Sequence, residues 1–145
     1  KDGRSAIAAT TGNDDCHIIL RGGKQPNYDA ASVEAAAAEL VKAKLAPAIM
    51  IDASHANSLK KPENQPKVVD EIAAQVAAGD TRIMGVMIES NLVAGRQDLV
   101  PGKPLVYGQS ITDGCIDWAS SETVLERLAE AVRQRRAAEP IALAG

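Results

Sequence analysis

Three short apolar segments, each followed by polar residues, recur at a regular interval and constrain the fold most strongly. They are residues 16–20 (CHIIL), 47–52 (PAIMID) and 82–89 (RIMGVMIE). The polar residues at their ends, Arg21, His55 and Glu89, are separated by two equal steps of 34 residues. Continuous apolar runs of this length are typical of strands in a parallel sheet that is buried on both faces.

The intervening segments have the composition of helices. They cover residues 29–45, 65–80 and 120–136. The first begins with Asp29, a residue type favoured at helix N-caps, and is rich in alanine. The second repeats apolar residues at helical spacing, with Pro66 in its first turn and Gly79 at its end. The third opens with serine as its cap. This alternation of strand and helix predicts βαβ units and a parallel sheet.

The spacing favours one architecture within this α/β class. A (β/α)8 barrel has about 250 residues, or roughly 30 for each βα unit, so three consecutive barrel units fit the observed steps. A doubly wound sheet is the alternative, but no glycine-rich dinucleotide fingerprint follows a strand. We expect residues 1–145 to form a single domain. Within it, residues 1–15 would form a hairpin, 16–136 the three βα units and 137–145 a tail.

Composition excludes several classes of function. The chain is 46% hydrophobic and 24% charged with a net charge of −3, so it lacks the positive field that attracts nucleic acid or anionic membranes. Three aromatic residues leave little surface for base stacking. No apolar run approaches the roughly 20 residues that span a bilayer. The two cysteines, Cys16 and Cys115, form no pairing motif, which fits a reducing, cytoplasmic setting. We therefore expect neither nucleic acid nor membrane as a partner.

Polar residues gather where functional groups of parallel α/β proteins are found, at the carboxyl ends of strands. His55 and Glu89 lie there, and Asp113 lies in a long loop that would hang over the same edge. One nitrogen and two carboxylates suit a divalent ion such as Zn, Mn, Fe or Co. The alternative is a hydrogen-bonded loop histidine, a glutamate paired with a cation and an aspartate that caps a turn. The residues alone leave both interpretations open.

Arg21, Gly22 and Gly23 form a second candidate site. A guanidinium beside exposed glycine amides suits a phosphate group. A glycine-rich turn with a surface arginine is an equally good interpretation of the pattern.

Four motifs resemble one family. They are DCHIILRGG, IDASHANS, GVMIES and YGQSITDGCIDW, which occur in that order. From about Ser5 to Arg136, the chain resembles the C-terminal part of class I DAHP synthases (3-deoxy-D-arabino-heptulosonate-7-phosphate synthase, phospho-2-dehydro-3-deoxyheptonate aldolase). The resemblance implies about the last three βα units of a (β/α)8 TIM barrel. It also implies a transferase that condenses phosphoenolpyruvate with erythrose 4-phosphate to give DAHP and phosphate, the first step of the shikimate pathway.

The resemblance also implies roles for individual residues. His55, Glu89 and Asp113 match three ligands of one divalent metal ion (Mn, Fe, Co or Zn), and His55 and Asp113 would also act in catalysis. Arg21 matches an arginine that contacts phosphoenolpyruvate. The fourth metal ligand of the family is a cysteine in a motif that this chain does not contain, and neither Cys16 nor Cys115 matches it.

The remaining expectations concern partners. The chain begins with Lys1 rather than Met, and we expect it to be part of a longer protein whose N-terminal part completes the barrel. The resemblance further implies a homo-oligomer and an aromatic amino acid effector. One alternative is the related 3-deoxy-D-manno-octulosonate 8-phosphate synthase. Another is a non-catalytic fragment that needs the missing N-terminal half.

Overall fold

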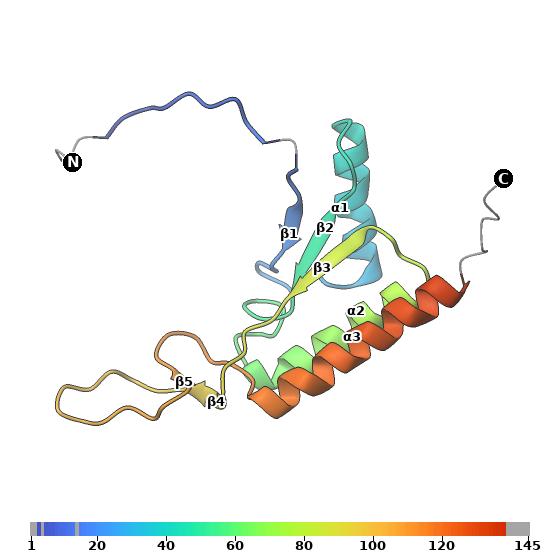
Figure 1. The fold of residues 1–145 in the computed structure, drawn as a ribbon. Helices are drawn as coiled ribbons and strands as arrows, with labels where there is room; N and C mark the ends of the chain where they lie inside the picture. Colours follow the sequence, from blue (N-terminus) through green and yellow to red (C-terminus); the bar gives the residue numbers. More distant parts are fainter. Residues whose placement is uncertain (1–2, 4, 14, 139–145) are drawn as a thin grey trace.

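The structure, a computed structural model that describes residues 3, 5–13 and 15–138, has the predicted alternation of strands and helices (Figure 1). The elements in order are β1 (Ile18–Leu20), α1 (Ala30–Lys42), β2 (Ile49–Asp52), the 3₁₀ turn η1 (Pro62–Asn64), α2 (Gln65–Ala77), β3 (Ile83–Met87), β4 (Val93–Arg96), β5 (Gln109–Ser110) and α3 (Trp118–Ala138). The α/β prediction is therefore confirmed, and three consecutive βα units are present.

The first three strands form a parallel sheet in the order β1-β2-β3. Leu20 pairs with Ile51, and Asp52 pairs with Met87, so the carboxyl ends of all three strands meet at one edge. This register brings the segments that follow each strand close together.

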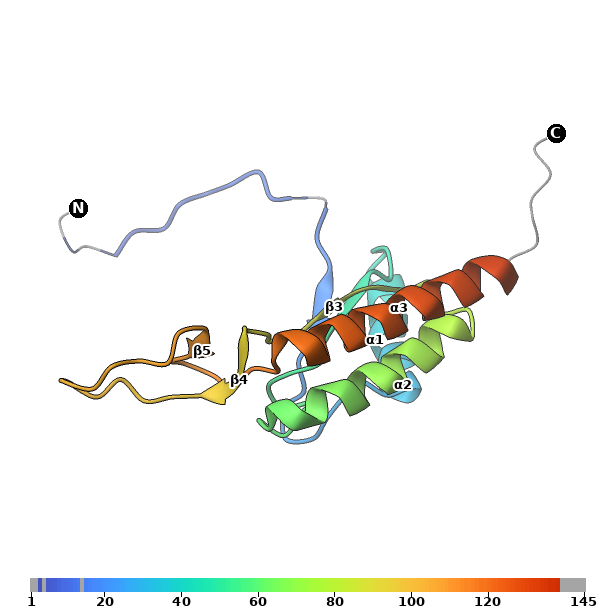
Figure 2. The same cartoon turned by 60° about the horizontal axis from the view of Figure 1, so that its bottom comes forward.

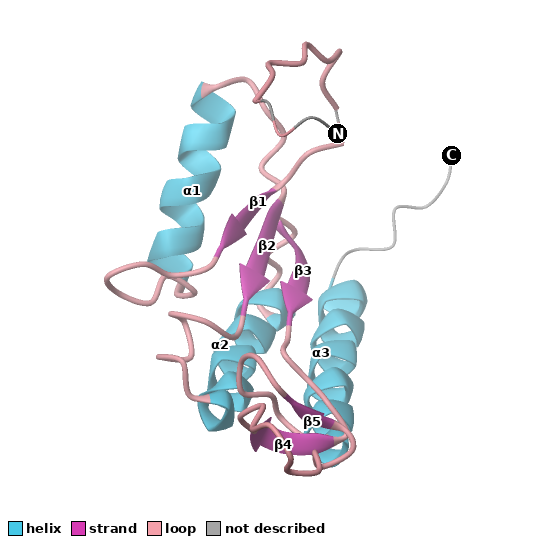
Figure 3. Ribbon diagram, turned by 90° about the vertical axis from the view of Figure 1, so that its left-hand side faces the viewer, coloured by secondary structure: helices cyan, strands magenta, loops and turns pink. Residues whose placement is uncertain are grey.

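Helices cover only one face of this sheet (Figures 1 and 3). The core between the sheet and the helices includes Ile49, Ile51, Val33, Val69 and Ile72, all with no exposed surface. On the other face, Ile19 is 51% exposed and Met84 is 57% exposed. Burial of both faces is thus wrong for this chain, because no element within the described residues covers the second face.

The helix ends follow local capping chemistry. Asp29 caps α1 as predicted, because its Oδ1 accepts from the backbone N–H of Ser32 at 3.0 Å. Helix α3 begins two residues before the predicted serine cap. Asp117 is the cap instead, since its Oδ1 accepts from the N–H of Ser120 at 2.8 Å. Helices α2 and α3 then run side by side in the same direction (Figures 1 and 2).

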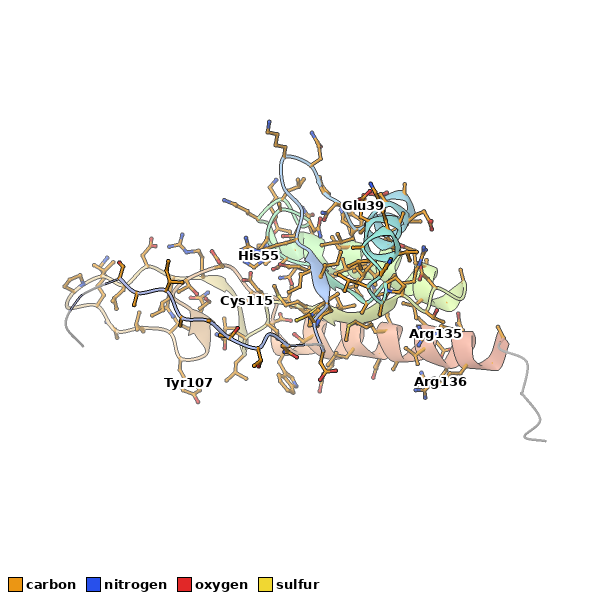
Figure 4. All side chains as sticks on the ribbon, turned by 90° about the horizontal axis from the view of Figure 1, so that it is seen from above. Glu39, His55, Tyr107, Cys115, Arg135 and Arg136 are labelled. Carbon is orange, nitrogen blue, oxygen red and sulfur yellow. The ribbon has the colours of Figure 1, made fainter. Side chains whose placement is uncertain are left out.

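The loop after β3 has more structure than expected. Strands β4 and β5 pair in parallel, with Val93 opposite Gln109, and the chain between them forms an arm that extends away from the helices (Figures 1 and 2). Figure 4 shows Tyr107 on this arm, pointing outward.

The N-terminal hairpin expected over residues 1–15 is not found among its described residues. Residues 5–13 run as an exposed segment without strand pairing, and Ile7 is fully exposed. An apolar strand needs a neighbouring strand, and the described part of the chain offers none here. The expected tail begins late, because α3 includes residues 137 and 138, and residues 139–145 lie outside the described part.

No helix in the described ranges has a stretch that is long and apolar enough to cross a membrane.

Candidate metal and anion site

The polar residues predicted from the strand ends surround one cavity of about 410 Å³ at the carboxyl edge of the sheet. Arg21 directly follows β1, His55 lies in the turn after β2, and Glu89 lies two residues beyond β3. Asp113 reaches the cavity from the loop after β5. The structure therefore brings together all four candidate residues, which are far apart in the sequence.

His55 is oriented by the end of its own strand. Its Nδ1 lies 2.7 Å from Oδ2 of Asp52, a carboxylate with no exposed surface, and 2.7 Å from Oγ of Ser54. The hydroxyl of Ser54 also donates to Oδ1 of Asp52 at 2.7 Å. Because an ionised carboxylate can only accept, Nδ1 carries the proton and Nε2 keeps its lone pair. Nε2 is then the ring atom available as a ligand in the cavity.

Nε2 of His55 faces two carboxylates. It lies 3.5 Å from Oε1 of Glu89 and 4.0 Å from Oδ2 of Asp113. One ligand atom from each of the three residues lies within 4.8 Å of the other two. Ligands at roughly 2.1 Å from a single ion are separated by about 3–4 Å, so small side-chain movements would let these three share an ion. The donor set of one nitrogen and two oxygens also suits a divalent metal.

The charges around Glu89 also favour a bound cation. Burial raises the pKa of Glu89 above its ordinary value. The negative charges of Asp113 and Asp52 add to this shift, and the guanidinium of Arg21 opposes it. A cation among these groups would favour the ionised carboxylate, so the site has the charge distribution of a cation site.

Arg21 extends from the same edge with its side chain 61% exposed, and its Nε lies 3.6 Å from Oδ2 of Asp52. Lys60 also lines the cavity, which therefore has two cations near its mouth. The expected use of glycine amides for an anion is not borne out. The N–H of Gly22 donates to Oδ1 of Asn27 at 2.7 Å, and the N–H of Gly23 donates to the carbonyl of Gln25 at 3.0 Å. An anion would therefore meet the two cationic side chains instead.

Asn57 connects the two strand ends. Its Nδ2 donates to the carbonyls of Leu20 at 3.0 Å and Asp52 at 2.8 Å, and its Oδ1 accepts from the N–H of Asn27 at 2.8 Å. Asn57 therefore joins backbone segments and makes no hydrogen bond to His55. Among the residues near His55 in the turn, Asp52 and Ser54 are the ones that form hydrogen bonds with its imidazole.

Sequence reasoning missed one residue that contacts this site. Gln65, the first residue of α2, is fully buried and bonds to the backbone of Glu89. No sequence pattern indicates that a glutamine at the start of a helix will bond to the backbone of a strand end. The cysteines behave as packed or solvent-exposed thiols: burial raises the pKa of Cys115, and Cys16 is exposed.

The fold and cavity define a parallel α/β protein with its candidate functional side chains at the carboxyl edge of the strands. Residues 3–126 match the family model of the DAHP synthetase I family. The chain belongs to this family.

Curated relatives and a solved structure agree with this assignment. The chain is 54% identical over 139 residues to the phospho-2-dehydro-3-deoxyheptonate aldolase of Haemophilus influenzae, which covers 95% of this chain and 38% of the relative. It is 52% identical over 136 residues to the Phe-sensitive enzyme of Escherichia coli K12, over 94% of this chain and 39% of the relative. The aldolase structure from Francisella tularensis superposes with a TM-score of 0.85 at 49% identity, over 90% of this chain and 38% of that one. The chain therefore spans less than two fifths of the length of these proteins.

Proposed function

We propose that this chain forms about the last three βα units of a (β/α)8-barrel DAHP synthase. The complete protein would condense phosphoenolpyruvate with erythrose 4-phosphate to give DAHP and phosphate, the first step of the shikimate pathway. The observation that carries the proposal is the convergence of His55, Glu89 and Asp113 beside Arg21 in one cavity. About half of the residues are identical to those of named aldolases over nearly the whole chain.

The proposed metal site consists of His55, Glu89 and Asp113. Together with a cysteine from the part of the protein outside this chain, they would hold one divalent ion (Mn, Fe, Co or Zn). When bound, the ion would supply a Lewis acid that polarises a carbonyl oxygen. The carboxylate of Asp52 fixes the proton on Nδ1 of His55, so the ligand nitrogen stays available without a change of tautomer.

The remaining groups of the site would orient the substrates. The guanidinium of Arg21 would hold phosphoenolpyruvate so that its C3 faces the aldehyde carbon of erythrose 4-phosphate. A carbon–carbon bond forms between these atoms, water adds to C2 of phosphoenolpyruvate, and the C2–O bond to phosphate breaks. The carboxylate of Asp113, which is 73% exposed, can also exchange a proton with the forming alcohol.

The two histidines provide a matched test of the metal site. In the complete enzyme, His55→Ala should lose bound metal and lower turnover by at least about 100-fold, because it removes a ligand. His17→Ala alters an exposed residue before β1 and should change neither. Metal content by elemental analysis and turnover by phosphate release would be measured on both variants. Unchanged metal content and turnover in His55→Ala would show the ligand assignment to be wrong.

Two alternatives lead to different measurements. The 3-deoxy-D-manno-octulosonate 8-phosphate synthase alternative would show turnover with arabinose 5-phosphate in place of erythrose 4-phosphate, but the family match supports the first reaction. The alternative of a non-catalytic fragment is supported by the exposed sheet face and by the short span of the relatives that the chain covers. This alternative predicts that the chain alone has no turnover, and that turnover appears only when the N-terminal part of the protein is added.

The proposal extends to regulation and assembly. Relatives named Phe-sensitive, tyrosine-inhibited and Trp-sensitive match the chain at 52%, 54% and 52% identity. This supports an aromatic amino acid as the class of effector for the complete protein. A homo-oligomer is supported by two exposed aromatic side chains, Tyr107 at 88% and Trp118 at 58%, because aromatic side chains are enriched at interfaces.

A further inference from the structure

The backbone of Glu89 lies beyond the ladder of β2 and β3. Its carbonyl accepts from the N–H of Ile116 beside the isolated bridge of Ser90 and Ile116, but its own N–H has no backbone partner among the described residues. The ladder between β2 and β3 ends with the pair Asp52 and Met87. Glu89 follows two residues later, where only its carbonyl is held by another backbone segment. A strand end that carries a ligand therefore needs support from another element.

Gln65 supplies this support from the start of α2. Its Nε2 donates to the carbonyl of Glu89 at 3.0 Å, and its Oε1 accepts from the N–H of Glu89 at 2.9 Å. Both polar groups of the glutamine side chain bind the same residue, as an adjacent strand would. Two bonds to one residue restrict both its position and its rotation.

Gln65 is buried, so its polar side chain has lost its hydrogen bonds to water and depends on the contact with Glu89. The side chain has no exposed surface, and the oxygen and the nitrogen of its amide each form a hydrogen bond with Glu89. A buried amide is tolerated only when its hydrogen bonds are made, whereas an apolar side chain would fill the same space without that requirement. Packing alone therefore does not explain a glutamine at this position.

The same turn also supports the loop that carries Asp113. A Cβ added to Gly114 would lie 3.1 Å from Cγ of Pro62, so this loop packs closely on the η1 turn that precedes Gln65. The N–H of Ile116 donates to the carbonyl of Glu89 at 3.0 Å. The start of α2, the end of β3 and the Asp113 loop thus meet at one carbonyl group.

We propose that Gln65 is a positioning residue for the metal site, which places the carboxylate of Glu89 by holding its peptide group. This inference rests on the proposed function of His55, Glu89 and Asp113 as ligands. Gln65 itself does not bind the ion or the substrates. It lowers the freedom of Glu89 before metal binding, and so increases metal affinity.

Two buried glutamines of the same helix allow a controlled test in the complete protein. Gln65→Met keeps the length of the side chain and removes both hydrogen bonds. Gln75→Met is the control, ten residues along α2. It removes the single hydrogen bond that Nε2 of Gln75 donates to the carbonyl of Tyr28, and Gln75 does not line the cavity. Titration with Co²⁺ or Mn²⁺ should show about 10-fold or greater loss of affinity for Gln65→Met, as is typical when a supporting residue of a metal site is removed. Gln75→Met should keep the wild-type affinity.

A second measurement separates this inference from the metal proposal. Hydrogen exchange of the Glu89 amide in the metal-free protein should become faster in Gln65→Met and stay unchanged in Gln75→Met. Wild-type metal affinity in Gln65→Met, in a protein that loses metal in His55→Ala, would overturn the inference and leave the proposed site intact. If wild type and His55→Ala bind metal equally, the proposed site fails, and the exchange of the Glu89 amide still decides whether Gln65 holds this peptide.

Gln65→Glu is the second variant in case Gln65→Met does not fold. It keeps an acceptor for the N–H of Glu89 and loses the donor to its carbonyl. We expect metal affinity between those of wild type and Gln65→Met, with the Glu89 amide still protected from exchange. Wild-type metal affinity in Gln65→Glu would contradict the need for the two-point contact.

Discussion

At the residue scale, Gly22 determines how the arginine loop meets the turn after β2. Its φ of +74° lies in the left-handed region, and an added Cβ would lie 2.8 Å from Cβ of Ala56. Gly22→Ala in the complete protein should lower the free energy of unfolding by about 2 kcal/mol, because it combines an unfavourable φ with a steric clash. Urea unfolding would measure the loss, and binding of phosphoenolpyruvate should weaken as Arg21 shifts.

Gly23 is the matched control for this prediction. It has no neighbouring atom within 4 Å of an added Cβ, and its φ is not in the left-handed region. Gly23→Ala should therefore change stability by less than about 0.5 kcal/mol, as is usual for surface substitutions. Equal losses of stability in Gly22→Ala and Gly23→Ala would show that the close contact between Gly22 and Ala56 does not determine the stability of the loop.

At the element scale, α1 and α2 end in the same hydrogen-bonded motif with different residues. In α2, Gly79 has a φ of +106° and donates to the carbonyl of Val76, and Asp80 donates to that of Gln75. In α1, Lys44 takes the corresponding position with a φ of +60° and donates to the carbonyl of Val41. Glycine adopts this conformation without the steric cost of a Cβ. Lys44→Gly should raise the free energy of unfolding by about 0.5–1 kcal/mol.

The reciprocal change provides the comparison. Gly79→Ala should lower stability by about 1 kcal/mol, because the left-handed conformation is costly for alanine. Thermal unfolding of the two variants should therefore shift in opposite directions. A lower stability for Lys44→Gly would mean that the lysine side chain contributes more than its backbone strain costs.

At the scale of the whole molecule, one face of the sheet is not covered by any element of the described residues. Ile19 and Met84 lie on it with about half of their surface exposed. If the remainder of a longer protein covers this face, Ile19→Ala and Met84→Ala should each lower the stability of the complete protein by about 2–5 kcal/mol, the cost of truncating buried apolar side chains. Denaturant unfolding of the complete protein would measure this. Changes below about 0.5 kcal/mol would indicate that the face stays exposed to solvent.

Much of the fold and of the candidate site follows from local sequence patterns. Apolar runs predict β1, β2 and β3, and Asp29 and Gly79 mark helix ends, because these signals act between neighbours in the chain. The convergence of Arg21, His55 and Glu89 also follows, since consecutive parallel strands place their carboxyl ends at one edge. Asp113 was expected near the same edge because its long loop follows the third strand, and the resemblance in four motifs added its match to a metal ligand.

Tertiary structure decided the features that depend on contacts between distant segments. The amides of Gly22 and Gly23 are already bonded, Asn57 joins two strand ends, and Gln65 holds Glu89, although none of these partners is indicated by spacing. The expected hairpin did not form in the described residues, because a strand pattern specifies an edge but cannot supply its partner. The sequence by itself thus determined the strands and helices of the βα units and the edge of the sheet where the candidate site residues lie. Hydrogen bonds between segments far apart in the chain decided how the arginine loop and the backbone of Glu89 are held there.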